Sequence, residues 1–228
     1  MTDVAGNLEK LREKIRLAER QYHRKPGSVR LLAVSKSRSA VEIHTAVACE
    51  QMDFGENYLQ EAVTKMAALD NSGIRWHFIG PVQSNKTRAI AERFEWVHSL
   101  DRIKIATRLN DMRPATAPPL NVCLEINISA EPTKSGINPE ALSELAAAIS
   151  GMPRLRLRGL MTMPKPCNDF AGQRSAFHRL RDYYDGLKAE GLQLDTLSMG
   201  TTDDMEAAIA EGSTMVRIGT AIFGPRDK

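Results

Sequence analysis

The sequence of 228 residues has few cysteines, few aromatic residues and no long apolar run. Its three cysteines, Cys49, Cys123 and Cys167, are far apart and odd in number. They form neither a disulfide framework nor a C-x-x-C metal site, and we interpret them as buried or idle thiols in a reducing compartment. No apolar segment approaches the roughly 20 residues of a transmembrane helix. Asp3 and Glu9 lie where a signal peptide would be apolar, so we predict a cytoplasmic protein.

A strong excess of either charge is also missing. The chain has 31 basic and 28 acidic residues, and its net charge of +3 is too balanced to indicate a nucleic-acid partner. Arg154, Arg156 and Arg158 form a local basic cluster without interleaved aromatic residues, so we expect them to face solvent. The length and the ordinary apolar content suit one domain with a sizeable core, spanning residues 1–228. No membrane or nucleic-acid partner is expected, and we expect a monomer because no interface signature is present.

Apolar periodicity predicts that strands and helices alternate along the chain. A first amphipathic helix is expected at 4–23, because its apolar residues recur at three- and four-residue steps. The strands are expected at 29–36, 53–57, 76–80, 95–99, 121–128, 155–163, 195–199 and 214–223. The helices between them are expected at 41–50, at 59–69, from about residue 84, at 102–112, at 138–151, at 170–190 and through 205–212.

Such alternation indicates parallel strands joined by crossover helices, which is an α/β fold. Eight units in about this length fit a single (β/α)8 TIM barrel with an extra N-terminal helix. The alternative is an open doubly wound sheet. The sequence lacks the G-x-G-x-x-G that would follow the first strand of a dinucleotide-binding sheet of that kind.

The first strand segment, 29–36, ends an apolar run on a lysine. Leu31 to Val34 is typical of a strand that is buried on both faces. An ammonium group at the end of such a strand loses hydration, which favours the neutral amine. A neutral amine at Lys36 can condense with an aldehyde to form a Schiff base. The alternative, which this strand alone favours, is a lysine that reaches solvent or pairs with a carboxylate.

Catalytic groups of such barrels lie at the carboxyl ends of the strands, often with a phosphate beyond strands seven and eight. After the expected seventh strand, Gly200 allows close approach of the backbone, and Thr201 and Thr202 offer hydroxyl groups near a helix start. The alternative is a simple helix cap, in which Asp203 and Glu206 make a capping-box-like pair.

The expected eighth strand supplies a cation and a second part of the phosphate site. With a two-residue period, Arg217 points into the barrel, and Gly219 and Thr220 can cradle a phosphate. The alternatives are an interior ion pair for the arginine and simple relief of crowding by the glycine. Together with Lys36, these residues make an aldehyde anchor, a cation at ring level and a phosphate cup on one rim. Pyridoxal 5′-phosphate needs all three.

The chain resembles, nearly from end to end, the YggS/PROSC family of pyridoxal phosphate homeostasis proteins, whose barrel is similar to the N-terminal domain of alanine racemase. The resemblance is carried by LLAVSKSR (31–38), FGENYLQE (54–61), WHFIGPVQSNK (76–86), KSGI (134–137), RLRGLMTMP (156–164) and MVRIGTAIFG (215–224). It implies that Lys36 forms the Schiff base and that Arg217 faces the pyridine nitrogen. It also implies that Thr202, Gly219 and Thr220 hold the phosphate and that Asn57 and Met199 line the ring pocket.

One segment departs from the family pattern. The family usually reads Gly-Met-Ser after strand seven, whereas this chain has Gly200, Thr201 and Thr202. Thr202 keeps a hydroxyl at the phosphate position, so cofactor binding is expected to survive. Thr201 in place of methionine makes this rim more polar.

The resemblance also bears on catalysis. An arginine at the pyridine nitrogen does not favour ring protonation, so the ring is a weak electron sink. Racemases of this barrel type tolerate that arginine, but they recruit a catalytic tyrosine from a C-terminal β-domain. The last expected strand ends near Phe223 and the sequence ends at Lys228, so we expect no such domain. We therefore predict a protein for pyridoxal phosphate homeostasis without clear turnover, not an enzyme, with apo pyridoxal enzymes as recipients.

Several residues are left with two interpretations. Tyr58 lies just beyond the second expected strand, and His77 and His98 fall on the third and fourth, where core histidines with satisfied hydrogen bonds are commoner than catalytic ones. Lys134 is a candidate secondary amine for cofactor transfer, with a solvated loop lysine as the alternative. The competing functions are a minimal amino-acid racemase or decarboxylase and a lysine-dependent aldolase.

Overall fold

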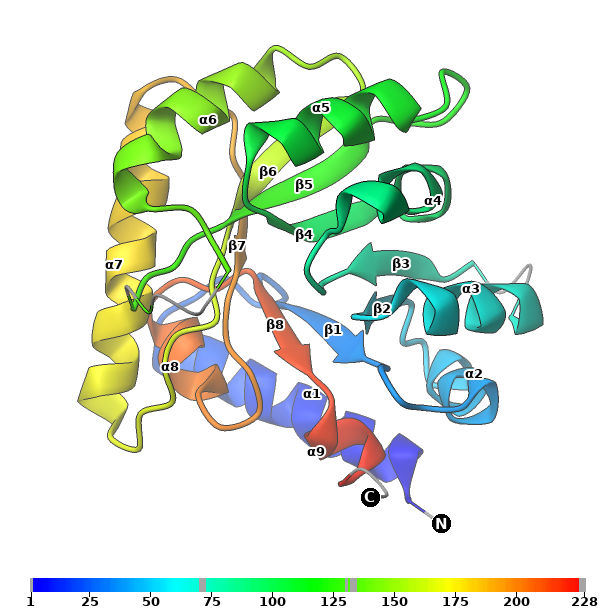
Figure 1. Ribbon diagram of the computed structural model, residues 1–228. Helices are drawn as coiled ribbons and strands as arrows, with labels where there is room; N and C mark the ends of the chain where they lie inside the picture. The colour runs from blue at the N-terminus through cyan, green and yellow to red at the C-terminus, as the bar shows by residue number, and fades with distance from the viewer. Residues whose placement is uncertain (1, 70–72, 130, 132–134, 226–228) are drawn as a thin grey trace.

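A computed structural model describes residues 2–69, 73–129, 131 and 135–225. Eight strands of the described chain form a closed barrel in which each pairs in parallel with the next and β8 pairs with β1, as Figure 1 shows. The predicted (β/α)8 barrel is confirmed. The strands are β1 Arg30–Val34, β2 Asp53–Glu56, β3 Arg75–Phe78, β4 Trp96–Leu100, β5 Leu120–Glu125, β6 Leu155–Met161, β7 Thr196–Ser198 and β8 Met215–Ile218.

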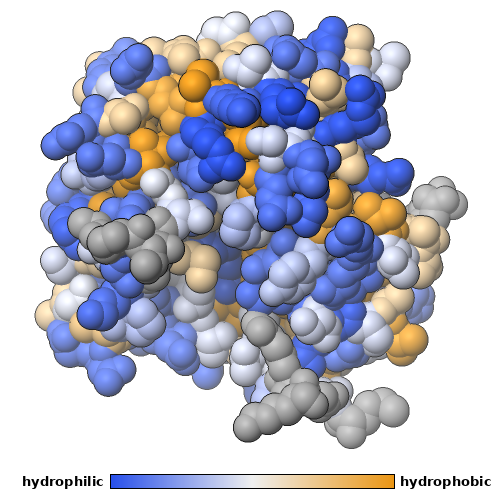
Figure 2. Space-filling view, in the orientation of Figure 1, coloured by the Kyte–Doolittle hydropathy of each residue, from blue (hydrophilic) through white to orange (hydrophobic). Residues whose placement is uncertain are grey.

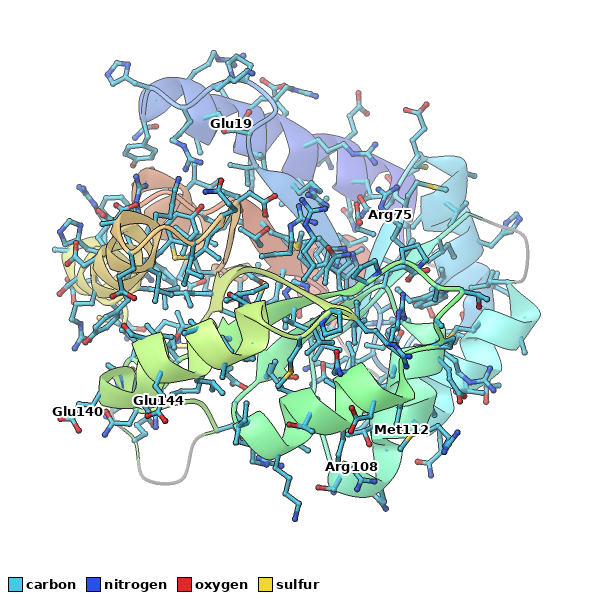
Figure 3. The ribbon with its side chains drawn as sticks, turned by 90° about the horizontal axis from the view of Figure 1, so that it is seen from above. Glu19, Arg75, Arg108, Met112, Glu140 and Glu144 are labelled. Carbon is cyan, nitrogen blue, oxygen red and sulfur yellow. The ribbon has the colours of Figure 1, made fainter. Side chains whose placement is uncertain are left out.

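Helices surround the barrel, with α5 and α6 on the side opposite α1 (Figure 3). The α-helices are α1 Val4–Gln21, α2 Ala40–Ala48, α3 Leu59–Ala68, α4 Thr87–Arg93, α5 Ile103–Met112, α6 Leu142–Ser150, α7 Phe170–Ala189, α8 Met205–Ala210 and α9 Thr220–Phe223. Two 3-10 turns precede α4 and α6, η1 Ser84–Lys86 and η2 Pro139–Ala141.

The extra N-terminal helix, α1, begins at a capped end and buries one apolar stripe. The Asp3 side chain accepts a hydrogen bond from the Gly6 N–H at 2.9 Å, which satisfies a free donor of the first turn. Leu8, Leu11 and Ile15 lie on the buried face, at the spacing that an amphipathic helix requires. This face packs against α2, α8 and α9, so α1 joins the first and last parts of the barrel.

The prediction of a strand over 214–223 is wrong in its second half. β8 ends at Ile218, and the apolar segment that follows it is the short helix α9. The N–H groups of Ile222 and Phe223 donate to the Gly219 carbonyl at 3.0 Å, and both side chains are fully buried. A short apolar run cannot distinguish a buried strand from a buried helical turn, and packing against α1 decides it here.

The first strand also ends earlier than predicted, and this places Lys36 in a loop. β1 ends at Val34, and the Ser35 N–H makes one further hydrogen bond, to the Gly55 carbonyl at 3.0 Å. Ser37 then adopts a positive φ of 60°, which turns the chain away from the barrel. Lys36 therefore lies just beyond the strand, at the mouth of the barrel.

Two cores of different composition result from the closed sheet. A large apolar cluster fills the space between the strands and the helices. A small second cluster of Trp96, Cys123 and Met161 is accompanied by two fully buried histidines, His77 and His98, which contact Trp96. Because side chains of a strand alternate between its faces, these residues fill the barrel interior, which is unusually polar.

The surface mixes polar and apolar residues, and on the face of Figure 2 hydrophobic residues show only in small patches. None of the helices in the described part of the chain is long and apolar enough to cross a membrane. Within the basic cluster of β6 and the turn before it, Arg154 and Arg156 are exposed as expected. Arg158 instead pairs with Asp195 at 2.6 Å.

Candidate functional site

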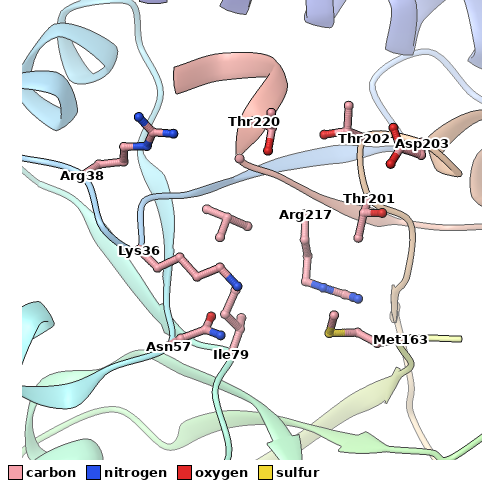
Figure 4. A pocket seen from close by; sticks show the side chains of 12 residues that line it. Lys36, Arg38, Asn57, Ile79, Met163, Thr201, Thr202, Asp203, Arg217 and Thr220 are labelled. Carbon is pink, nitrogen blue, oxygen red and sulfur yellow. The ribbon is translucent and has the colours of Figure 1, made fainter. Parts of the chain in front are cut away.

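A cavity of about 270 Å³ opens at the carboxyl ends of the barrel strands. Its walls come from the end of β1, from the segments that follow β1, β2, β3, β6 and β7, and from β8 with the start of α9. Lys36 and Arg217 point into the same space, as Figure 4 shows. Six of the predicted site residues line the cavity: Lys36, Asn57, Thr202, Arg217, Gly219 and Thr220.

The seventh predicted residue, Met199, does not line the cavity. It is fully buried in the apolar cluster, where its N–H donates to the Met215 carbonyl at 3.1 Å and its carbonyl accepts from the Ser213 hydroxyl at 2.7 Å. The side chain of the preceding residue, Ser198, makes hydrogen bonds with His98 and Arg217 inside the barrel. Because side chains of a strand alternate between its faces, the Met199 side chain points outward.

A buried cluster of charges lies beside the loop that carries the lysine. Lys65 on α3 donates from Nζ to the Ser35 carbonyl at 2.6 Å, to Glu56 Oε1 at 2.7 Å and to Glu61 Oε1 at 2.5 Å. The Ser35 hydroxyl donates to the same Glu56 oxygen at 2.6 Å. Burial raises the pKa of the Glu56 carboxyl, and the hydrogen bonds from Lys65 and Ser35 oppose that rise. The cluster thus ties α3 and β2 to the end of β1.

The same cluster holds both neighbours of Lys36 in the chain. Lys65 binds the carbonyl of Ser35, and Glu61 accepts the N–H of Ser37 at 2.5 Å. The peptide groups before and after the lysine are therefore fixed, and with them the point from which its side chain enters the cavity. The sequence reveals the i, i+4 spacing of Glu61 and Lys65 but not that both reach this loop.

Asn57 presents an unsatisfied acceptor at the cavity. Its Oδ1 atom is buried and has no hydrogen-bond partner within the described part of the chain. Buried amide oxygens are almost always paired, so an unpaired one that faces a cavity indicates a ligand that carries a donor. In Figure 4 the Asn57 amide lies beside the Lys36 side chain.

Arg217 is held from inside the barrel and is only 4% exposed. Its Nη1 donates to the Ser198 carbonyl at 2.5 Å and to the Ser198 hydroxyl at 2.9 Å, and its Nη2 donates to the Thr162 carbonyl at 2.8 Å. These acceptors are neutral, which differs from the interior ion pair considered above. Burial lowers the pKa of Arg217 to about 10, so the guanidinium remains charged at neutral pH.

The turn after β7 forms one edge of the cavity. Gly200 adopts a φ of 99°, a conformation that suits glycine. The N–H and hydroxyl of Thr201 donate to Asp204 Oδ1 at 2.6 and 2.9 Å, which holds the turn. The capping pair of Asp203 and Glu206 is not formed: Asp203 lines the cavity, and Glu206 accepts from the Tyr22 hydroxyl at 2.8 Å.

The end of β8 needs a glycine for close packing. A Cβ atom at Gly219 would lie 3.1 Å from the Val34 carbonyl oxygen, so a larger residue would push β8 away from β1. Gly219 therefore both relieves crowding between β8 and β1 and forms part of the cavity wall. Thr220 follows at the start of α9 and lines the same edge as Thr202.

Arg38 is a cavity residue that sequence reasoning missed. Its Nη2 donates to the carbonyls of Gly224 and Pro225 at 2.5 and 3.0 Å, and its guanidinium lies 5.9 Å from the centre of the Phe223 ring. It ties the loop after β1 to the chain beyond α9 and brings a second positive charge to the cavity. A loop arginine has no periodic signal, so the only clue was its place in the LLAVSKSR segment.

The other candidates lie away from the cavity. His77 and His98 are fully buried and contact each other, with 2.9 Å between His77 Nδ1 and His98 Nε2, as expected for core histidines. Tyr58 is the N-cap residue of α3 and is 58% exposed, without lining the cavity. Lys134 lies outside the described residues.

Comparison with known proteins agrees with this geometry. The family model described as "Alanine racemase, N-terminal domain" matches residues 6–227. Curated relatives named "Pyridoxal phosphate homeostasis protein" from Pseudomonas aeruginosa and Escherichia coli K12 are 56% and 54% identical to this chain. The alignments cover 100% of this chain and 97% and 98% of the two relatives.

Solved structures give the same result. The structure of PipY from Synechococcus elongatus with pyridoxal phosphate bound is 34% identical, has a TM-score of 0.86, and aligns over 97% of this chain and 100% of PipY. Alanine racemase from Corynebacterium glutamicum is 18% identical with a TM-score of 0.69, covering 99% of this chain and 61% of the racemase. The latter similarity shows the fold alone.

Proposed function

The chain belongs to the alanine racemase N-terminal domain family and, within it, to the pyridoxal phosphate homeostasis proteins, and we propose that its cavity binds pyridoxal 5′-phosphate to regulate the supply of this cofactor. The observation that carries the proposal is the convergence of an amine, a guanidinium and a hydroxyl-rich edge on one cavity. We place this function in the cytoplasm, because the three cysteines are free thiols.

The cavity residues fit this cofactor. Lys36 supplies the amine for covalent attachment of the aldehyde carbon, and the unpaired Asn57 oxygen accepts a hydrogen bond from the ligand. Arg217 can only donate, which suits the lone pair of an unprotonated pyridine nitrogen. Thr202 and Thr220 line the cavity, and their hydroxyls can donate hydrogen bonds to an anionic group such as the phosphate. When bound, pyridoxal phosphate supplies a reactive aldehyde and an electron-withdrawing ring.

We further propose that the protein holds and releases the cofactor without turnover of its own. Arg217 cannot protonate the pyridine nitrogen, so the ring is a weak electron sink. A racemase also needs a second acid–base group on the opposite side of the substrate. Among the described residues that line the cavity there is no tyrosine and no histidine. Apo pyridoxal enzymes are the proposed recipients.

One observation favours a second candidate function, a minimal racemase or decarboxylase. Glu125 ends β5 at the same end of the barrel, and burial together with the charge of Asp101 raises its pKa to about 7. A carboxylate with that pKa suits general acid–base chemistry near neutral pH. It is not among the residues that line the cavity, so we rank this candidate second.

The test is an absorption spectrum of the purified protein before and after addition of pyridoxal phosphate, followed by incubation with the standard amino acids. We expect a visible band from the lysine-bound cofactor and no amino-acid turnover. Borohydride reduction and peptide mass mapping should then place the pyridoxyl tag on Lys36. Exchange of the α-proton or loss of carbon dioxide would instead support the second candidate. Absence of both band and tag would overturn cofactor binding.

A further inference from the structure

A continuous chain of hydrogen bonds crosses the barrel interior and ends on the cavity arginine. It joins side chains from five positions that the sequence separates by up to 164 residues. The links are Asp53 Oδ1 to His77 Nε2 at 3.0 Å, His77 Nδ1 to His98 Nε2 at 2.9 Å, His98 Nδ1 to Ser198 Oγ at 2.8 Å, and Ser198 Oγ to Arg217 Nη1 at 2.9 Å. We call these five residues the Asp53–Arg217 chain.

The two ends of the Asp53–Arg217 chain lie at opposite ends of the barrel. Asp53 is the first residue of β2, whereas Arg217 lines the cavity at the carboxyl ends of the strands. At the far end, Arg75 donates to both Asp53 oxygens, from Nε at 2.8 Å and from Nη2 at 2.7 Å, and its side chain is 50% exposed. A surface ion pair is therefore connected to the cavity through buried side chains only.

The chemistry of the end groups sets one direction for every bond. A guanidinium only donates and a carboxylate only accepts. Because Arg217 donates to Ser198, the serine hydroxyl is free to donate to His98 Nδ1. His98 then donates from Nε2 to His77, which donates from its own Nε2 to Asp53. In this direction both histidines are neutral, with the proton on Nε2, and every ring nitrogen is satisfied.

The opposite direction conflicts with the charges in the barrel. It would require a protonated Asp53 or a positively charged His77. Burial alone raises the pKa of Asp53, but the hydrogen bonds from Arg75 and His77 outweigh it and hold that pKa below its usual range. Burial lowers the pKa of both His77 and His98. The directed, neutral arrangement is therefore the stable one at neutral pH.

We propose that the Asp53–Arg217 chain positions the Arg217 guanidinium for the ring of the bound cofactor. The inference rests on the proposed function and names the residues that tune its ring contact. His98 holds the hydrogen of the Ser198 hydroxyl, so that the lone pairs of that oxygen face Arg217. Without this acceptor the hydroxyl hydrogen can rotate toward the guanidinium, which costs Arg217 one of its acceptors. Asp53, His77, His98 and Ser198 are thus positioning residues.

The first test needs no cofactor. Nitrogen-15 NMR of labelled histidine reports which ring nitrogen carries the proton, and His77→Gln and His98→Gln assign the two signals. We expect both rings to be neutral with the proton on Nε2. A proton on Nδ1, or a charged ring, at either position in the wild type would overturn the direction of the chain.

The second test compares two aspartates at the same end of the barrel. Asp53 accepts hydrogen bonds from Arg75 and His77. In Asp53→Asn an amide NH2 group faces one of these donors, so the variant disturbs the Asp53–Arg217 chain from its far end. Asp195→Asn is the control. Asp195 also accepts a hydrogen bond from an arginine, Arg158 Nη2 at 2.6 Å, but it makes no hydrogen bond to any residue of the Asp53–Arg217 chain. Circular dichroism and melting curves establish that both variants fold.

The cofactor-loaded proteins are then compared by dissociation constant and absorption maximum. For Asp53→Asn we expect a roughly two- to thirtyfold higher dissociation constant for pyridoxal phosphate and a shifted absorption maximum, with Asp195→Asn unchanged. His98→Leu should have a similar effect. His98→Gln should recover part of the loss, because glutamine again offers one donor and one acceptor.

The outcomes separate this inference from the proposed function. If folded Asp53→Asn and His98→Leu proteins bind the cofactor with the wild-type constant and spectrum, the positioning role is wrong and cofactor binding stands. Equal effects of Asp53→Asn and Asp195→Asn would also overturn it, since they would indicate general destabilisation. If the wild type binds no pyridoxal phosphate, the proposed function fails, and the positioning role fails with it. In that case the NMR measurement of the histidine tautomers still tests the direction of the hydrogen bonds in the Asp53–Arg217 chain.

Discussion

The two groups that point into the cavity are held by opposite kinds of chemistry. Lys36 emerges from a loop that is fixed by charged side chains, with the Lys65 ammonium between Glu56 and Glu61. Arg217 is fixed by neutral oxygens, and the chain behind it passes through neutral histidines. The lysine side therefore depends on buried charges that must remain paired. The arginine side depends on hydrogen-bond direction, which the charged groups at the two ends of the Asp53–Arg217 chain set and the neutral histidines between them transmit.

This difference assigns different roles to the lysine side and the arginine side of the cavity. A lysine that reacts as a neutral amine must keep its place whether or not it is charged, and an ion cluster on its neighbours gives that rigidity. The arginine keeps its charge throughout, so it needs directed acceptors rather than a counter-ion. Each half can be perturbed without touching the other, which makes the comparison testable.

The largest expected effect comes from removing the amine itself. Lys36→Ala should abolish the visible band and the borohydride-stable tag, because no other cavity residue of the described chain carries a primary amine. Absorption spectra and peptide mass mapping measure this. Arg217→Ala is the matched control from the other half, and it should retain the tag. Persistence of an unchanged band in Lys36→Ala would move the attachment to another lysine.

A large loss of stability is expected when the ion cluster loses its cation. Lys65→Met leaves Glu56 and Glu61 without their partner, and breaking a buried ion pair from one side costs about 3–5 kcal/mol of unfolding free energy. Urea denaturation measures the change. Lys10→Met is the control, since Lys10 is exposed on α1 and should change the unfolding free energy by less than about 0.5 kcal/mol. Equal changes in the two variants would show that the cluster contributes no net stability.

A substitution on the arginine side should change the absorption spectrum of the bound cofactor more than the affinity for the cofactor. Arg217→Lys keeps the positive charge but cannot reach the Ser198 and Thr162 oxygens together, because an ammonium lacks the planar fork. We therefore expect a shifted absorption maximum with a dissociation constant raised by about tenfold or less. Titration with pyridoxal phosphate gives both quantities at once. An unaltered spectrum would argue against contact between Arg217 and the ring.

The barrel and most of the cavity follow from local patterns. Lys36 could be placed because it follows the apolar run of the first strand, and Arg217 because of the two-residue period of the last, and strand ends of a parallel barrel meet on one rim. The roles expected for the two residues came from the family resemblance. The family resemblance implied a place for Met199 in the ring pocket, whereas the structure buries its side chain in the apolar cluster, since one residue decides which face of a strand a side chain occupies. The apolar segment after Gly219 carries no local signal that distinguishes a strand from a helical turn, since packing against α1 is not visible in the sequence.

The supporting groups could not be predicted from the sequence. His98 and Ser198 are 100 residues apart, and no local pattern indicates that they bond across the barrel. Lys65 has the spacing of an ordinary helical ion pair with Glu61, and only the fold brings it to the Ser35 carbonyl. Such contacts depend on closure of the sheet rather than on propensity.

The smallest expected effect concerns a carboxyl near the arginine side. Burial and the charge of Asp101 raise the pKa of Glu125 from 4.5 to about 7 in the folded protein. The folded state therefore binds this proton more tightly than the unfolded chain, so the stability it contributes is present below about pH 4.5 and is lost as the pH rises to about 7.

Glu125→Gln removes this pH dependence, because glutamine stays neutral. At pH 8 we expect the variant to be more stable than the wild type by no more than about 3 kcal/mol, and the difference should vanish near pH 4. Urea denaturation across this pH range measures it. The chain on the arginine side would keep its neutral histidines in both proteins. If Glu125→Gln instead lost stability at pH 8, the carboxylate would be paired with Arg217, and the guanidinium would be held by a counter-ion rather than by neutral acceptors alone.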